Sequence, residues 1–212
     1  METISAYSAE VLRLLGQITR LRIVEALREK ELYVSEIFTI LEEEQSNVSK
    51  HLSQMAKNGI LGTRKDPESP KCYYRVKLTG IFGIIDLAKR LVEREREGLQ
   101  GVAALPFVAD VLKEIGQPSR MAIIAALRAG EMQVSDIVKA VELERSNTSR
   151  HLSGMKAAGV VARRVDERMQ AHYRLTNDYT LRIVDLTRLV VERDVRNRQE
   201  ALLRGMTNSA MT

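Results

Sequence analysis

Two polar segments, one hundred positions apart, repeat nearly the same residue types: QSNVSKHLS at 45–53 and RSNTSRHLS at 145–153. Each combines amide, hydroxyl and cationic side chains, which are the groups that hydrogen-bond to base edges and phosphates of DNA. In the first segment Val48, Leu52 and Met55 recur at helical spacing. The pattern therefore predicts a short helix with an apolar inner face and a polar outer face, of the kind that enters a DNA groove.

The side chains of the polar face are the candidates for reading DNA. Gln45 suits a bidentate hydrogen bond to adenine and Arg145 or Arg150 to guanine, each worth about 1–3 kcal/mol of discrimination. For His51 and His151 two interpretations stay open, a contact with DNA or a half-buried ring that packs the helix on its neighbour. The predicted DNA-binding residues are Gln45, Ser46, Asn47, Ser49, Lys50, His51, Arg145, Ser146, Asn147, Ser149, Arg150 and His151.

A β-hairpin wing is expected after each of these helices. Gly59 ends the first helix, and residues 60–64 and 73–77 then read as two strands joined by a turn that contains Pro67. The counterparts are 160–164 and 171–175. Cations in the wings are expected at phosphates or in the minor groove, where they position a protein without specifying sequence. The wing candidates are Arg64, Lys65, Arg75, Arg163, Arg164, Arg168 and Arg174.

The elements that must position these side chains also occur twice. Matches at a fixed period, such as Gly16 with Gly116 and Arg20 with Arg120, indicate a duplicated unit. Helices are expected at 4–15, 18–29, 34–41 and 46–58 of the first unit, with Ser35 and Ser46 as caps of the last two. The predicted domains are 1–100 and 101–212.

Each unit closes with a longer amphipathic helix, near 81–92 and 180–203. Such a helix either seals its own domain or packs against its twin, and we favour mutual packing because the twin is tethered beside it. The expected fold is mainly α with small β wings, two tandem winged helix-turn-helix domains packed as a pseudo-twofold dimer.

Positive charge is concentrated in the two predicted reading segments. Residues 45–77 and 145–175 each carry seven cations against two carboxylates, a net charge of +5 per segment. The whole chain carries only +5, so the remainder sums to −5. Ordinary solvated faces would also be charged, but the same enrichment in both copies favours contact with a polyanion.

The chain resembles two fused copies of the ArsR/SmtB family of winged helix-turn-helix transcriptional repressors. The resemblance lies in residues 44–52, where a Ser-Gln-Ser, Val-Ser and His-Leu pattern of the family falls, and in Pro118-Ser119-Arg120 before an aliphatic run. It implies a sequence-specific regulator of double-stranded DNA, most simply a repressor. Because Gln45 differs from Arg145 and Val48 from Thr148, the two half-sites are expected to form an imperfect palindrome.

The chain departs from the metal-sensing members of that family. The runs at 31–36 and 131–136 carry no cysteine where those members carry thiolates, and neither final helix has a histidine beside Asp86 or Asp185. We therefore expect no metal at the family sites and no cofactor. Cys72 is the one cysteine and sits in the first wing, where it is either a redox-active thiolate or, as we prefer, a structural thiol.

Several classes of protein are disfavoured. No P-loop, dinucleotide fingerprint, nucleophile elbow or HExxH motif occurs, so no enzymatic activity is expected. A tandem winged-helix adapter of a chromosome-organising complex remains the alternative, although it would not need cationic reading helices. No targeting or membrane-spanning segment is recognisable, which predicts a cytoplasmic protein that stays off membranes.

The expected partners are double-stranded DNA and an unidentified small-molecule effector, with the single chain functioning as a pseudo-dimer. The effector is expected between the terminal helices and the first helices of the units. Aromatic residues near that position are Tyr7, Phe82, Phe107 and Tyr179, although such residues more often belong to the core.

Overall fold

The computed structural model describes residues 2–68 and 71–209. The first half contains α1 (Glu2–Leu15), α2 (Ile18–Ala26), β1 (Leu32–Tyr33), α3 (Val34–Leu41), α4 (Gln45–Lys57), β2 (Leu61–Lys65), β3 (Cys72–Val76) and α5 (Ile81–Glu95). The second contains η1 (Gly101–Ala104), α6 (Leu105–Ile115), α7 (Pro118–Ala126), η2 (Leu127–Ala129), β4 (Met132–Gln133), α8 (Val134–Val141), α9 (Arg145–Ala157), β5 (Val161–Val165), β6 (Ala171–Leu175) and α10 (Tyr179–Ser209). Apart from η1 and η2, the order of elements is the same in both halves, which confirms the predicted fold class.

The wings are three-stranded sheets rather than the two-stranded hairpins expected. In the orders β1-β3-β2 and β4-β6-β5 all neighbours are antiparallel. The two-residue strands β1 and β4 each pair with the returning strand of the hairpin. Strands this short give no periodic signal in a sequence, but they tie each wing to the start of α3 or α8.

Both predicted serine caps are wrong. The residues at the N-caps of α3 and α4 are Tyr33 and Glu44, so Ser35 and Ser46 lie inside the first helical turns. At α3 the Glu36 carboxylate accepts a hydrogen bond from the Tyr33 backbone N–H at 3.0 Å. At α4 no side chain caps the helix, which leaves the Ser46 hydroxyl on the surface.

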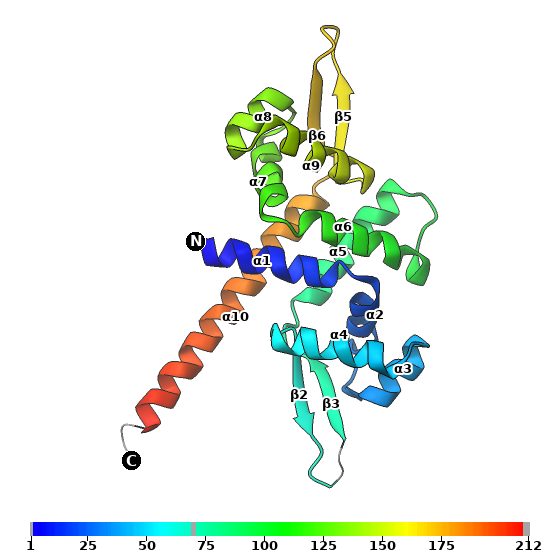
Figure 1. The fold of residues 1–212 in the computed structure, drawn as a ribbon, viewed down its shortest axis with the longest axis vertical. Coiled ribbons are helices and arrows are strands. Elements are labelled where there is room, and N and C mark those ends of the chain that lie inside the picture. Colours follow the sequence, from blue (N-terminus) through cyan, green and yellow to red (C-terminus); the bar gives the residue numbers. More distant parts are fainter. Residues whose placement is uncertain (1, 69–70, 210–212) are drawn as a thin grey trace.

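One hydrophobic core runs through both halves of the molecule. α1 packs on α6 and α5 packs on α10, and the cross pairs of α1 with α10 and α5 with α6 complete the junction. Figure 1 shows α1, α5, α6 and α10 at the centre, with the two wings pointing in opposite directions. The predicted mutual packing of the terminal helices is confirmed.

Two glycines make reciprocal contacts across this junction. A Cβ on Gly16 would lie 2.5 Å from the backbone nitrogen of Lys113, and a Cβ on Gly116 would lie 2.5 Å from that of Arg13. The positions differ by one hundred in both pairs, so residue i meets residue j on the twin and j meets i. This reciprocity is the mark of a twofold relation.

The halves differ at their C-terminal ends. α10 continues to Ser209, whereas the counterpart of the α5 end, Glu95, is Asp194. The additional part of α10 projects from the body of the molecule (Figure 1) and exposes Leu202 and Leu203.

Candidate nucleic-acid interface

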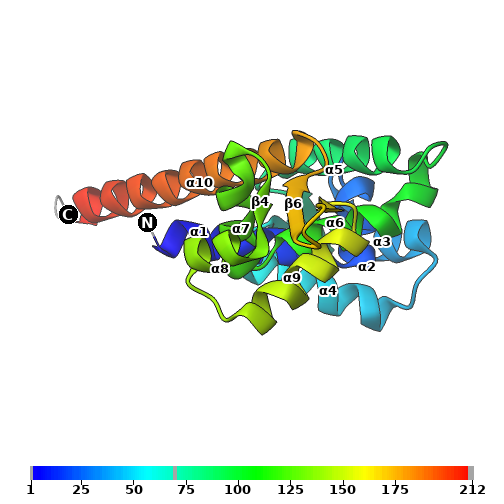
Figure 2. The same ribbon diagram turned by 90° about the horizontal axis from the view of Figure 1, so that it is seen from above.

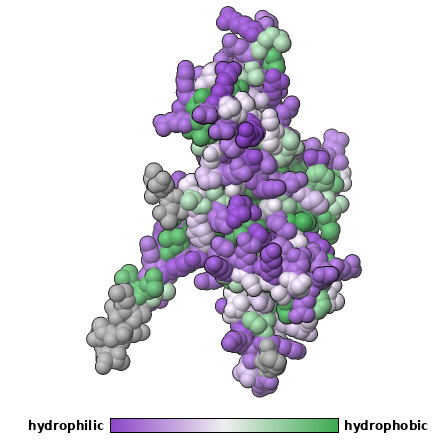
Figure 3. All heavy atoms as spheres, in the orientation of Figure 1, coloured by the Kyte–Doolittle hydropathy of each residue, from purple (hydrophilic) through white to green (hydrophobic). Residues whose placement is uncertain are grey.

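α4 and α9 lie on one face of the molecule, with α5 and α10 on the opposite face (Figure 2). In α4 the residues Val48, Leu52 and Met55 are fully buried, and in α9 the positions of Thr148, Leu152 and Met155 are equally buried. The polar side of each helix is therefore turned outward. Figure 3 views this same face, and hydrophilic side chains cover most of its middle.

The proposed reading side chains are on the surface of these helices. Gln45, Ser46, Asn47, Lys50, Arg145, Ser146, Asn147, Ser149 and Arg150 are exposed, and Ser49 is half-buried. Within the described part of the chain, the side chains of Lys50, Arg145 and Arg150 make no ion pair. Their charges are therefore free for an external anion.

The two helices differ in how their asparagines are held. Asn47 Nδ2 donates to Glu43 Oε2 at 2.7 Å, and the other oxygen of Glu43 accepts from Arg22 and Thr19. In the second half Leu143 replaces Glu43, and the side chain of Asn147 has no such acceptor among the described residues. The amide of Asn47 is restrained in the free protein, while that of Asn147 is not.

Acidic residues also precede both helices, a feature that the charge count of the sequence left out. Glu42, Glu43 and Glu44 lower the net charge of +5 to +2 when the first segment is extended back to residue 42, and Glu142 and Glu144 lower the second to +3. Glu42 and Glu142 adopt left-handed backbone conformations in the turn before the helix. The positive charge is therefore carried by the outer faces of α4 and α9 and by the wings, and not by the turns.

An arginine beneath the first reading helix fixes its position. Arg20 on α2 donates from Nε to His51 Nδ1 at 3.3 Å and from Nη2 to Gln54 Oε1 at 2.6 Å. Burial, followed by the nearby Arg20 cation, lowers the pKa of His51. The neutral ring is thus the form that accepts the arginine proton, which fits the packing interpretation of this histidine.

The second half is built differently at this place, and His151 Nδ1 is buried with no hydrogen-bond partner among the described residues. Arg120 on α7 pairs with Glu114 Oε2 at 2.6 Å, and Gly154, the counterpart of Gln54, leaves room for both groups. Burial and then Arg120 lower the pKa of His151 as well. Sequence reasoning matched Arg20 with Arg120 as repeat positions but gave them no role, and Glu114 carried no recognisable signal.

The wing cations fall into two groups. Arg64 binds Glu31 at 3.0 Å and Arg164 binds Glu131 at 2.5 Å, and Arg75 lies 3.8 Å from Glu31. Among the described residues no ion pair involves the exposed side chains of Lys65, Arg163, Arg168 and Arg174. Glu31 and Glu131 are therefore residues of the interface that the sequence analysis missed.

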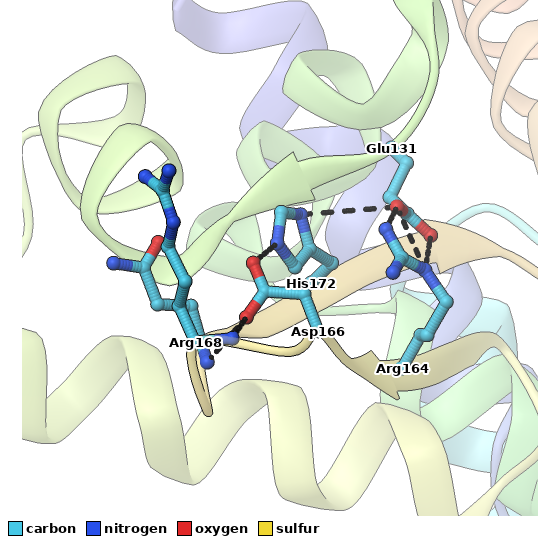
Figure 4. A network of polar contacts seen from close by, with 6 residues as sticks. Glu131, Arg164, Asp166, Arg168 and His172 are labelled. Atoms are coloured by element: carbon cyan, nitrogen blue, oxygen red, sulfur yellow. Dashed lines mark hydrogen bonds and ion pairs between the residues drawn. The ribbon is translucent and has the colours of Figure 1, made fainter.

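The second wing carries a further polar network (Figure 4). His172 Nε2 lies 2.9 Å from Asp166 Oδ2, while Asp166 Oδ1 accepts from the backbone N–H groups of Arg168 and Gln170. The hydrogen bond to His172, followed by the one from Gln170, lowers the pKa of Asp166. The network fixes the turn that presents Arg168.

Cys72 begins β3 of the first wing and is half-buried. Its partner in the ladder is Lys65. It is a free thiol, and its role stays a prediction.

The positions of the family's metal ligands are engaged by arginines. Arg28 binds Asp86 through its two terminal nitrogens, Nη2 at 2.8 Å and Nη1 at 3.2 Å. Arg128 binds Asp185 in the same way, at 2.5 and 3.1 Å. Each pair joins the turn just after the second helix of a half to the last helix of that half. Within the described ranges no three His, Cys, Asp or Glu side chains gather as a metal site would require.

A scaffold that presents a short helix beside a β-hairpin twice on one face defines a winged helix-turn-helix DNA-binding protein. A family model described as bacterial regulatory protein, arsR family, matches residues 18–62 and again residues 117–163. The transcriptional activator HlyU of Vibrio cholerae is 33% identical over 91 residues, which cover 43% of this chain and 82% of that protein.

The chain belongs to the ArsR family and is a DNA-binding transcription regulator with two winged helix-turn-helix units. The relatives are transcription regulators and not enzymes, and nothing in the matches supports an adapter of a chromosome-organising complex.

Solved structures of similar sequence cover single halves. A homodimeric winged helix-turn-helix domain from Mycobacterium bovis, titled a possible ArsR-family regulator, is 25% identical over 48% of this chain and 94% of its own, with a TM-score of 0.42. The transcriptional repressor BigR from Xylella fastidiosa is 27% identical over 37% of this chain and 79% of its own, with a TM-score of 0.35.

No helix among residues 2–68 and 71–209 has an apolar stretch that would span a bilayer.

Proposed function

We propose that one chain reads both half-sites of an imperfect palindrome and represses transcription from the promoter that contains it. The observation that carries the proposal is the placement of α4 and α9, which lie exposed on one face of a molecule with reciprocal Gly16 and Gly116 contacts. A pair of reading helices related in this way fits half-sites about 34–36 Å apart.

The roles within the interface follow from their surroundings. The exposed polar residues of α4 and α9 read bases, and the unpaired wing cations Lys65, Arg163, Arg168 and Arg174 bind phosphates. His51 holds α4 on Arg20, whereas beneath α9 Arg120 pairs with Glu114, and His151 Nδ1 is buried with no hydrogen-bond partner among the described residues. Arg64 and Arg164 brace the wings on Glu31 and Glu131.

Unequal half-sites follow from the differences between the two helices. Arg145 and an unrestrained Asn147 replace Gln45 and the restrained Asn47, so the second helix offers one more cation and a freer amide. We expect stronger selection of guanine in the half-site of α9.

We also propose that the chain responds to a signal other than a metal ion bound at Asp86 and Asp185. Asp86 and Asp185 are bound by arginines, and a cation there would have to displace two charge-assisted hydrogen bonds in each half.

The test begins with DNA selected from genomic fragments by the purified chain, followed by gel shifts on the selected duplex. Affinity should fall steeply between about 50 and 200 mM salt because several cations release counterions together. A reporter under the selected promoter should be more active when the chain is removed. Binding that does not depend on salt would contradict the DNA interface, and a less active reporter would contradict repression.

A further inference from the structure

A large cavity lies between α1, α7 and α10, on the side of the second half away from α9. Its volume is about 850 Å³, in the range of sites that hold small molecules. Ile4, Met121, Ala125 and Val184 provide an apolar lining, and Arg128 with Asp185 forms part of the rim. None of the four aromatic residues expected at an effector site lines it.

The corresponding place in the first half is closed. Glu25, the counterpart of Ala125, bridges Arg28 at 2.8 Å and Lys89 at 2.7 Å, and this bridge connects α2 with α5. In the second half Arg188, the counterpart of Lys89, pairs instead with Glu192 along its own helix at 2.8 Å. Loss of one carboxylate therefore removes the bridge from the corresponding place in the second half.

The wall of the cavity contributed by α1 is also less apolar than its counterpart in the first half. Leu105 and Val108 of α6 are buried in the closed half, and their counterparts in α1 are Ser5 and Ser8. Ser8 lines the cavity, is only 1% exposed, and its hydroxyl oxygen has no hydrogen-bond partner in the described structure. Buried hydroxyls nearly always have a partner, so this one has hydrogen-bonding capacity that is unused in the described structure.

We propose that this cavity binds one small, uncharged, largely apolar organic molecule that carries a single hydrogen-bonding group, which meets Ser8. Charge complementarity favours a neutral ligand, because both rim arginines are already paired with carboxylates. The duplication gives the chain one such site and not two.

The floor of the cavity is the helix that carries the second reading helix. Met121 and Ala125 of α7 face the cavity, while Arg120 of the same helix packs with Glu114 against Gly154 of α9. A molecule that separates α7 from α1 and α10 would displace α9 relative to α4. Resting on the proposed function, we infer that occupancy changes DNA affinity, and the reverse follows by linkage.

The test uses N-phenyl-1-naphthylamine, a neutral apolar fluorophore with one N–H donor, added to the full chain. We expect enhanced, blue-shifted emission with one probe bound per chain. Ala125→Phe, which fills the exposed apolar wall, should weaken binding about tenfold or more, and Ser8→Val, the residue of the closed half, should weaken it less. Ala129→Phe, on the exposed turn just beyond α7, is the matched control and should bind as the parent does.

A further variant tests whether the probe binds elsewhere on the protein. Leu202→Ser with Leu203→Ser removes the exposed apolar residues of α10 and should leave the probe signal unchanged. The site would be overturned by absence of probe binding, by two probes per chain, by unchanged affinity in Ala125→Phe, or by loss of signal in the α10 variant.

Coupling between the cavity and the DNA interface is measured separately, by repeating the probe titration with the selected duplex present. A shift in probe affinity supports the link through α7, and an unchanged affinity refutes it while the binding arm still stands. If no duplex is bound at all, the proposed function fails and the cavity result remains interpretable by itself.

Discussion

At the scale of single residues, Arg150 is an exposed cation on the outer face of α9 with no ion pair in the described chain. Arg150→Ala should weaken binding to the selected duplex by about 1–3 kcal/mol and should weaken non-specific binding much less, because a base contact is lost. Competition gel shifts measure both quantities. Arg182→Ala, with the same charge change on α10, is the control, and equal losses for the two variants would contradict the assignment of α9 as reader.

Two neighbouring arginines of β5 have different expected roles, one in contact with DNA and the other in holding the wing in place. Arg163 is unpaired in the described structure, whereas Arg164 is held by Glu131 (Figure 4). Arg163→Ala should therefore weaken binding to all sequences alike and reduce the salt slope by about 1, as expected for one lost phosphate contact. Arg164→Ala should reduce that slope less. A larger slope change in Arg164→Ala would place the phosphate contact on the other side of the wing.

The half-buried histidines of α4 and α9 predict a pH dependence of stability. His51 and His151 have pKa values lowered from 6.5 by burial and by the arginines beside them, so the unfolded chain binds protons more readily than the folded one. Their contribution is present above that value and is lost as the pH falls below it. Urea midpoints should be lower at about pH 5.5 than at about pH 7.5.

Replacing both rings by glutamine should reduce this difference, because glutamine does not titrate, and at position 51 its side-chain oxygen can still accept from Arg20. The prediction is wrong if the double variant keeps the full dependence on pH.

At the scale of elements, the close approach of α1 and α6 depends on glycine. Gly16→Ala would place a methyl group 2.5 Å from the backbone of Lys113, which cannot move without shifting α6. A loss of about 1–3 kcal/mol in the free energy of unfolding is expected, measured by urea denaturation. Gly62→Ala is the comparison, since its Cβ would meet its nearest neighbour at 3.6 Å. Similar stability of both variants would contradict the tight junction.

Most helices could be predicted from the sequence because their apolar residues recur at helical spacing. The buried stripe of α5, from Ile81 to Val92, and the inner face of α4 are where that periodicity placed them. The short strands β1 and β4 were missed because two residues carry no period, and the serine caps were wrong because a serine in the first turn resembles one at the cap. α10 runs six residues beyond the expected Leu203, through a segment (204–209) that has a single charged residue and no apolar stripe.

The polar contacts of the site were harder to predict from the sequence than its helices. Pairing of Arg164 with Glu131 joins residues 33 positions apart, and the exchange of Gln54 for Glu114 beneath the reading helices appears only once α6, α7 and α9 are placed together. Opposed side chains on different elements leave no pattern along the chain. The outer faces of α4 and α9 were predictable because the repeat itself displays them.

At the scale of the whole molecule, duplication has joined in one chain what a twofold dimer assembles from two. The halves have since diverged around a shared junction, with one closed and one open groove, and with one restrained and one free asparagine. A fused pair can hold such differences in fixed positions, which a dimer of identical subunits cannot.

The most direct test of this account is the stoichiometry of the complex on the selected duplex, measured by sedimentation equilibrium together with a footprint. We predict one chain per duplex and two protected patches whose centres lie about one helical turn apart, roughly 34–36 Å. Inserting half a turn of DNA between the patches should abolish the second contact. Two chains per duplex, or a single protected patch under one chain, would contradict the claim that α4 and α9 of one molecule read DNA together.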